Sequence, residues 1–162
     1  YRHPAFACAL LLAITGCTTT GSTDPSSINF RVPPGSRLVL NRDVRIGADY
    51  SHAKFQHGEQ TPGVDQYTIN CSLEQRDLGP SGIAPDSFLI TRSASARDWI
   101  NRPHTMRFYK VFHLRSERQP GVLRLECQYW DDPLFGRPVT ISQIREALGE
   151  LFSFEFAGAA AP

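Results

Sequence analysis

The sequence has little net charge and no long apolar run. Its formal net charge is +1 over 162 residues, so the overall charge does not favour nucleic acid or an anionic bilayer surface as a partner. The longest apolar run covers residues 5–14, whereas a membrane-spanning helix needs about 20 apolar residues. Hydrophobic residues make up 41% and charged residues 20%, which excludes a disordered chain and is typical of a globular domain.

The sequence also lacks the motifs of common catalytic sites. It contains no phosphate-binding glycine loop. The segment Gly79-Pro80-Ser81-Gly82 is not the G-x-S-x-G turn of serine hydrolases, because its serine lacks glycines at the required spacing. Cys71 and Cys127 have no partner at C-x-x-C spacing. We therefore predict no catalytic residue and no cofactor, and we favour a non-enzymatic role.

Lysine is scarce, because Lys54 and Lys110 stand beside fifteen arginines. Arginine pairs with carboxylates and phosphates in two-pronged geometry. One interpretation is a surface that binds an anionic polymer. The other, which we favour, is a general use of arginine on solvated strand faces.

The N-terminal segment has the layout of a bacterial export signal. Arg2 and His3 precede the apolar run 5–14 and a small-residue end. Ile14-Thr15-Gly16-Cys17 resembles the lipobox of bacterial lipoproteins, with an aliphatic residue three before the cysteine and a small residue directly before it. The resemblance implies that residues 1–16 are a signal peptide that is removed, and that Cys17 carries palmitate or similar acyl chains. The alternative is a buried apolar segment and an incidental thiol.

Residues 17–27 are rich in Thr, Ser and Gly and show no periodicity, which is typical of a flexible tether. Several acyl chains at Cys17 would hold such a tether to a membrane for a long time. Thr18 stands where the inner-membrane retention signal of enterobacterial lipoproteins has Asp. The resemblance therefore implies a bacterial envelope protein on the outer membrane, facing the periplasm.

Two cysteines remain in the predicted domain once Cys8 and Cys17 are assigned to the signal and the anchor. Cys71 shares a strand face with Ile69 and Leu73, and Cys127 lies on the apolar face of its own strand. Disulfides persist in an oxidising compartment. We therefore predict a Cys71–Cys127 disulfide, with two buried thiols as the alternative.

Alternating patterns and turn residues predict a β-rich domain. The clearest unit is a hairpin of 107–115 and 122–130, joined by a turn at 117–121. Further strands are predicted at 28–32, 37–46 with an interruption at Arg42, 53–56, 66–76 and 87–92. The segment 93–103 is predicted to be a loop anchored by Trp99.

After Pro138 the apolar spacing becomes helical. We predict a helix over 141–152, capped by Thr140 with Gln143, and a disordered tail over 157–162. Residues 28–156 then form a single domain. Its predicted fold is mainly β, an antiparallel sandwich or open barrel with one C-terminal α-helix.

No strong metal site is predicted. His52 and His57 are weak candidates, which Asp49 and Glu59 could join only through folded loops, because the two histidines lack the helical i, i+4 spacing of a zinc pair. The pair Asp131-Asp132 is predicted to end a strand and not to bind calcium, since calcium loops need alternating oxygen ligands and a glycine among them.

Three functions remain open at this point. The first is an envelope lipoprotein with a binding, accessory or structural role, whose partner is an envelope protein or an anionic polymer and not nucleic acid. The second is an exported metal-dependent hydrolase at His52 and His57. The third is a carrier of a small apolar ligand, which requires a pocket walled by residues such as Tyr67, Phe88 and Phe112.

Overall fold

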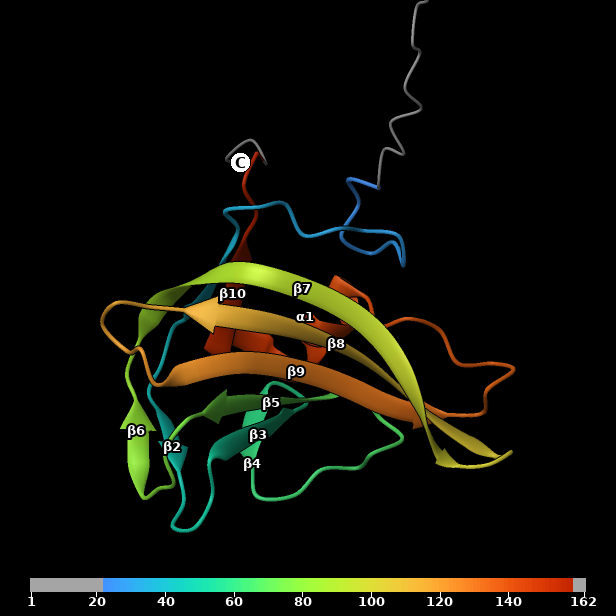
Figure 1. Ribbon diagram of the computed structural model, residues 1–162, viewed down its shortest axis with the longest axis horizontal. Helices are drawn as coiled ribbons and strands as arrows, with labels where there is room; N and C mark the ends of the chain where they lie inside the picture. The colour runs from blue at the N-terminus through green and yellow to red at the C-terminus, as the bar shows by residue number, and fades with distance from the viewer. Residues whose placement is uncertain (1–21, 159–162) are drawn as a thin grey trace, which may run out of the picture.

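A computed structural model describes residues 22–158 of the chain (Figure 1). The predicted signal peptide, the lipobox and Cys17 lie outside the described residues, as does the end of the predicted tail, 159–162. Residues 22–27 of the predicted tether form turns, in which the Ser26 amide donates to the Asp24 carboxylate at 2.8 Å.

The fold is mainly β, and an eight-stranded antiparallel sheet curls into a half-barrel (Figure 1). The strand order is β10-β1-β7-β8-β9-β5-β3-β4. The strands of this sheet are β1 (Arg37–Leu40), β3 (His52–Gln56), β4 (Glu59–Thr61), β5 (Asn70–Gln75), β7 (Asp86–Asn101), β8 (Thr105–Arg115), β9 (Val122–Asp131) and β10 (Phe152–Glu155). A separate ribbon pairs β2 (Val44–Ile46) with β6 (Ser81–Ile83).

Alternation along the strands gives the sheet an apolar concave face and a polar convex face. On β9, Leu125 and Cys127 are fully buried, whereas Glu126 and Gln128 between and beside them are half-buried. The matching residues on β5, Cys71 and Leu73, point to the same concave side. This period-two pattern confirms the predicted hairpin of β8 and β9.

Helix α1 (Ile141–Leu148) packs its apolar stripe against β3, β5 and β10. The buried residues of the helix are Ile141, Ile144, Ala147 and Leu148. Its start is fixed by the predicted capping box, in which the Gln143 amide donates to Thr140 Oγ1 and the Thr140 amide donates to Gln143 Oε1 at 2.9 Å. The helix thereby fills the concave side of the half-barrel next to β3 and β5.

The predicted helix end at residue 152 was wrong. Helix α1 stops at Leu148, because Gly149 takes a positive φ of 56°, a conformation that suits glycine. A 3₁₀ turn (Gly149–Leu151) follows, and β10 then pairs with β1. The apolar residues Phe152, Phe154 and Phe156 also alternate with period two, so this segment was compatible with a strand.

Two strand predictions and one loop prediction also need correction. Residues 28–32 form no strand, since only Phe30 makes an isolated bridge to Ser22. The predicted strand 37–46 is divided between two sheets as β1 and β2, although its buried parity is as predicted. Residues 93–101, predicted to lie in a loop, continue β7 because their backbone pairs with β8.

The predicted strand 66–76 begins only at Asn70. Asp65 holds the preceding residues in a turn, accepting from the Tyr67 amide and the Thr68 hydroxyl, both at 3.0 Å. Tyr67 is consequently 64% exposed and does not point inward as predicted. β4 was not predicted, and it forms a hairpin with β3 through His57 and Gly58, which both have positive φ.

Candidate functional site

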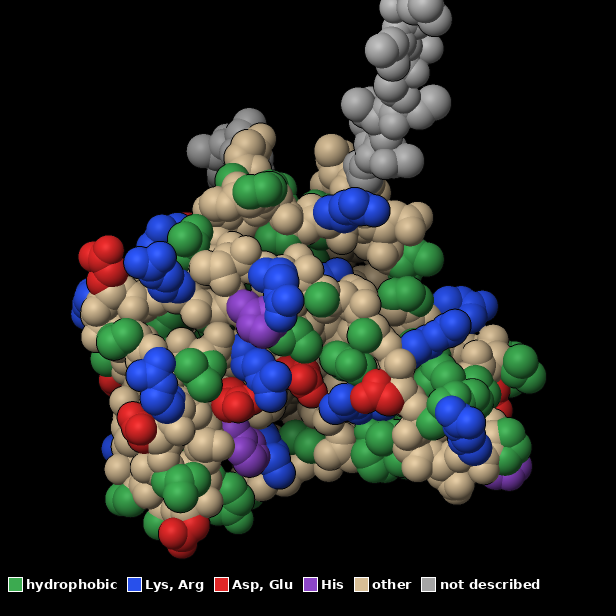
Figure 2. Space-filling model, in the orientation of Figure 1, with side chains coloured by type: hydrophobic (Ala, Val, Ile, Leu, Met, Phe, Trp, Pro, Cys, Tyr) green, Lys and Arg blue, Asp and Glu red, His purple; other side chains and the backbone are tan. Residues whose placement is uncertain are grey.

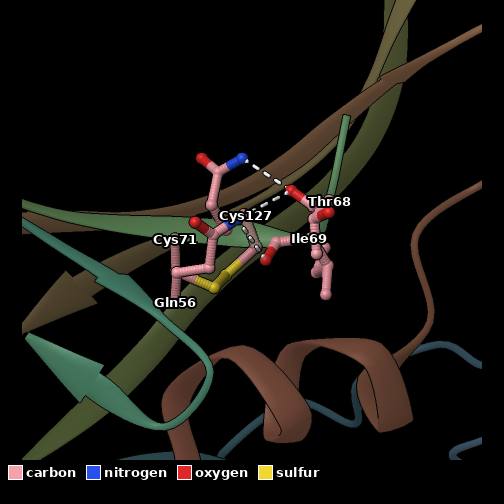
Figure 3. Close-up of a disulfide and its surroundings, with 6 residues drawn as sticks. Gln56, Thr68, Ile69, Cys71 and Cys127 are labelled. Atoms are coloured by element: carbon pink, nitrogen blue, oxygen red, sulfur yellow. Dashed lines mark hydrogen bonds between the residues drawn. A yellow bond between two sulfur atoms is a disulfide. The ribbon is translucent and has the colours of Figure 1, made fainter. Parts of the chain in front are cut away.

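The predicted disulfide between Cys71 and Cys127 is present (Figure 3). The two cysteines are direct partners in the β5–β9 register, with their Cα atoms 4.0 Å apart. Neither is more than 1% exposed, so the bond is structural and inaccessible to a substrate. Beside the disulfide, the side-chain amide of Gln56 donates to the backbone carbonyl of Asp65 at 2.8 Å and to that of Thr68 at 3.3 Å.

The structure does not gather the weak metal candidates into a metal site. His52 lies on β3 with its ring against Tyr50, at a centroid distance of 5.8 Å. His57 occupies the following tight turn and is exposed. Among residues 22–158, no three His, Cys, Asp or Glu side chains lie close enough together to hold a metal ion.

The predicted walls of an apolar-ligand pocket do not meet. Phe88 and Phe112 are fully buried in the core, and Phe112 packs on Phe154 at a ring distance of 5.4 Å. Tyr67 stands outside the core against Trp130, with ring centroids 5.9 Å apart. Water does not reach Phe88 or Phe112, so these two side chains line no open cavity, and Tyr67 lies on the surface away from them. The three residues therefore do not enclose a ligand pocket.

An open cavity of about 950 Å³ lies elsewhere, between the N-terminal segment and strands β7 and β8. We call it the N-terminal cleft. Its lining residues are Ser22, Ile28, Asn29, Phe30, Arg31, Val32, Ser93, Ala94, Ser95 and Lys110. The volume is within the range of small-ligand sites, and the lining combines apolar side chains with two cations and no carboxylate.

Lys110 is the most unusual residue of the cleft. It belongs to the concave row of β8, where its neighbours at i±2 are Phe108 and Phe112, and only 5% of it is exposed. Its cross-strand neighbours are Ser95 on β7 and Cys127 on β9. Burial lowers the pKa of the Lys110 ammonium below its ordinary 10.5. Among the described residues, this ammonium makes no hydrogen bond or ion pair, but it is not one of the buried nitrogens without a partner, which are Arg107 Nε and Trp130 Nε1, so it reaches the open cleft.

Arginines on the convex face of the sheet, unlike Lys110, have carboxylate partners. Figure 2 shows basic and acidic side chains interspersed on this face. Arg107 lies 2.6 Å from Asp98 and 3.1 Å from Glu126. Arg124 pairs with Glu74 at 2.6 Å. Both arginines are more exposed than Lys110 and have carboxylate partners, whereas Lys110, a largely buried lysine, has none among the described residues.

Sequence reasoning recorded Lys110 only as one of two lysines. The signal that would have found it is parity, because Lys110 falls on the same strand face as Met106, Phe108, Phe112 and Leu114. On an otherwise apolar strand face, the amine of a lysine is deprotonated, forms an ion pair, reaches solvent or binds a ligand. The opposite wall of the cleft, residues 28–32, has no regular structure and gave no such signal.

No protein family model, curated protein or solved structure matches the chain. Within residues 22–158, no helix has the length and apolar character needed to cross a bilayer.

Proposed function

We propose that this protein is a bacterial envelope lipoprotein, anchored through Cys17 to the outer membrane on its periplasmic side, that binds an anionic partner in the N-terminal cleft. The observation that carries the binding role is Lys110, a lysine of the apolar strand face that is 5% exposed and lines an open cleft. The lipobox resemblance of Ile14 to Cys17 supports the anchor.

A buried charge without a partner is unfavourable, and an anion in the cleft removes that cost. The new contact is a charge-assisted hydrogen bond, which is stronger than a neutral one. Arg31 lines the same cleft and adds positive potential. An arginine at position 110 would remain charged in the empty cleft, whereas lysine can release its proton there. Binding of an anion should therefore raise the pKa of Lys110.

The binding test uses the two lysines as internal comparison. We suggest labelling the lysine side chains with ¹³C and ¹⁵N, and adding N-acetylglutamate and inorganic phosphate separately as anionic probes. The Lys110 signal should titrate below the ordinary lysine value of 10.5, and at least one probe should shift it and raise its pKa. Lys54 belongs to the convex face, so its signal should not move. An ordinary pKa for Lys110 and no shift with either probe would disprove the binding role.

The anchor needs a separate test. Expression in a bacterial host with an alkyne analogue of palmitate should label the wild-type chain. Cys17→Ser should abolish the label, whereas Cys8→Ser should retain it, because Cys8 lies in the predicted signal peptide. Mass spectrometry of the purified protein should find Cys17 as its first residue. A native protein that keeps residues 1–16 and has no acyl group would refute the anchor but not the cleft.

A further inference from the structure

Strand β7 has a free edge beside the cleft. On one side it pairs with β8 along Leu89–Asn101, but on the other side β1 pairs with it only over residues 86–89. The last contact on that side is the Ile90 amide, which donates to the Ser36 carbonyl at 2.9 Å. Beyond Ile90, no strand within residues 22–158 pairs with this edge, so in that part of the chain its outward backbone groups have no strand partner.

The N-terminal cleft lies along this edge. Ser93, Ala94 and Ser95 line it from β7, and residues 28–32 line it from the opposite side without pairing. The edge sequence Ser-Ala-Ser-Ala over 93–96 has neither the charges nor the proline that usually protect an exposed edge. Small side chains there permit close approach of another backbone. The cleft therefore stands where a further strand of the sheet would run.

Lys110 supplies an independent indication of the occupant. Its partner in the neighbouring strand is Ser95, and the small serine leaves room for the lysine side chain to extend under β7 toward the cleft. A strand added at the edge would direct every second side chain to this concave side. An acidic side chain at the position facing Ser95 would meet the Lys110 ammonium.

Resting on the proposed function, we infer that the ligand is an extended acidic peptide of a partner protein, which adds to the free edge of β7 at residues 93–97 and places a carboxylate on Lys110. Backbone hydrogen bonds would supply affinity, and the carboxylate would supply specificity, as in other cases of strand addition. Arg97 shares the concave parity, and Arg31 lies across the cleft, so the charge is complementary to an acidic segment. A second copy of this chain is disfavoured, because it would bring Lys110 and Arg97 toward their own duplicates.

The experiment begins with a fully randomised decapeptide display library, panned on the full-length chain in detergent. Enriched peptides should contain an acidic residue within an alternating β-strand pattern. Panning on Lys110→Met should lose the acidic preference. One enriched peptide is then synthesised with its acidic residue intact and with the amide analogue in its place. Replacement by the amide should weaken binding to the wild-type chain by about tenfold or more, tenfold being the low end for a close charge pair, and should have little effect on Lys110→Met.

The strand geometry has its own control. N-methylation of the peptide at alternate backbone amides of one parity should abolish binding, because those amides donate to β7. Methylation at the other parity should have little effect, because those amides face away from the edge. Hydrogen exchange should slow at alternate amides within residues 93–97 only when the unmethylated peptide is bound.

Three results would overturn the inference: no enrichment of acidic peptides, equal sensitivity to methylation at both parities, or a peptide-free dimer in sedimentation with residues 93–97 already protected from exchange. The proposed function would survive any of these results if N-acetylglutamate or phosphate still shifted the Lys110 signal. If no probe shifted that signal and no acidic peptide were enriched, both proposals would fail together.

Discussion

The two ends of the concave face differ in what covers them. Near β3, β5 and β9 the face is covered by α1 and crosslinked by the disulfide, and Phe55, Leu73 and Leu125 are completely buried. Along the second half of β7, by contrast, β1 is absent and residues 22–32 are the nearest cover. The covered end is a closed apolar core. At the open end, a lysine and a strand edge have no partner within residues 22–158, which leaves both to a ligand.

The largest expected effect is at the covered end. Replacing both Cys71 and Cys127 by alanine should lower the free energy of unfolding by about 4 kcal/mol, as expected for a crosslink that closes a loop of this size. Urea denaturation of the purified protein measures the loss. Cys8→Ala should leave stability unchanged, because Cys8 lies in the predicted signal peptide. A loss below about 1 kcal/mol would show that the disulfide does not hold the covered end together.

The next effect compares one isoleucine from each end. Ile144 of α1 is 0% exposed and Ile100 of β7 is 44% exposed. Ile144→Ala should cost about 3 kcal/mol of unfolding free energy, because it leaves a cavity in the core. Ile100→Ala should cost less than about 1 kcal/mol. Denaturation of both variants tests the contrast, and equal losses would contradict it.

Removing the unsatisfied cation should stabilise the open end. Lys110→Met should raise the free energy of unfolding by roughly 1–3 kcal/mol, since a largely desolvated polar chain is replaced by an apolar chain of similar length. Lys110→Arg is the matched control and should lower stability, because a guanidinium stays charged. If Lys110→Met were less stable than the wild type, the ammonium would have a favourable partner in the folded protein.

The advantage of Lys110→Met should also depend on pH. The folded pKa of Lys110 is lowered and its unfolded pKa is about 10.5, so between these values the unfolded chain binds more protons than the folded one. The contribution of Lys110 to the free energy of unfolding of the wild type therefore rises with pH between the folded and the unfolded pKa of Lys110. The gap between wild type and Lys110→Met should narrow as pH rises through this range, and denaturation at several alkaline pH values measures this. A constant gap would indicate that Lys110 titrates normally.

The smallest effect concerns the start of the covering helix. Thr140→Ala removes the hydroxyl that accepts from the Gln143 amide and should cost about 1 kcal/mol. Thr140→Ser keeps an acceptor and should lose little. Thermal denaturation distinguishes the two variants. Equal behaviour of alanine and serine would mean that the capping box does not stabilise α1.

The sequence predicted the fold best where one face of an element is buried. The β8–β9 hairpin, the disulfide and the cap of α1 follow from strong local patterns at Cys71, Cys127 and Thr140. The second half of β7 was missed because both of its faces and one edge meet solvent, so no alternation marks it. β10 was missed because its apolar residues fit a helix almost as well as a strand.

Only part of the candidate site could be predicted from the sequence pattern. The buried parity of Lys110 is visible in the sequence, because apolar residues occupy the same face of β8. The cleft itself depends on where β1 separates from β7 and on the irregular path of residues 28–32. Pairing partners of this kind are set by long-range contacts, which local periodicity does not encode.

The use of only two lysines has a practical consequence. Lys54 lies on the convex side of the sheet and Lys110 is enclosed on the concave side. With a removable peptide bound over Lys110, coupling reagents directed at lysine amines should therefore attach the domain to a bead or sensor through Lys54, on its convex side. Every immobilised molecule would then present the free edge of β7 outward, in a uniform orientation suited to capturing whatever docks there.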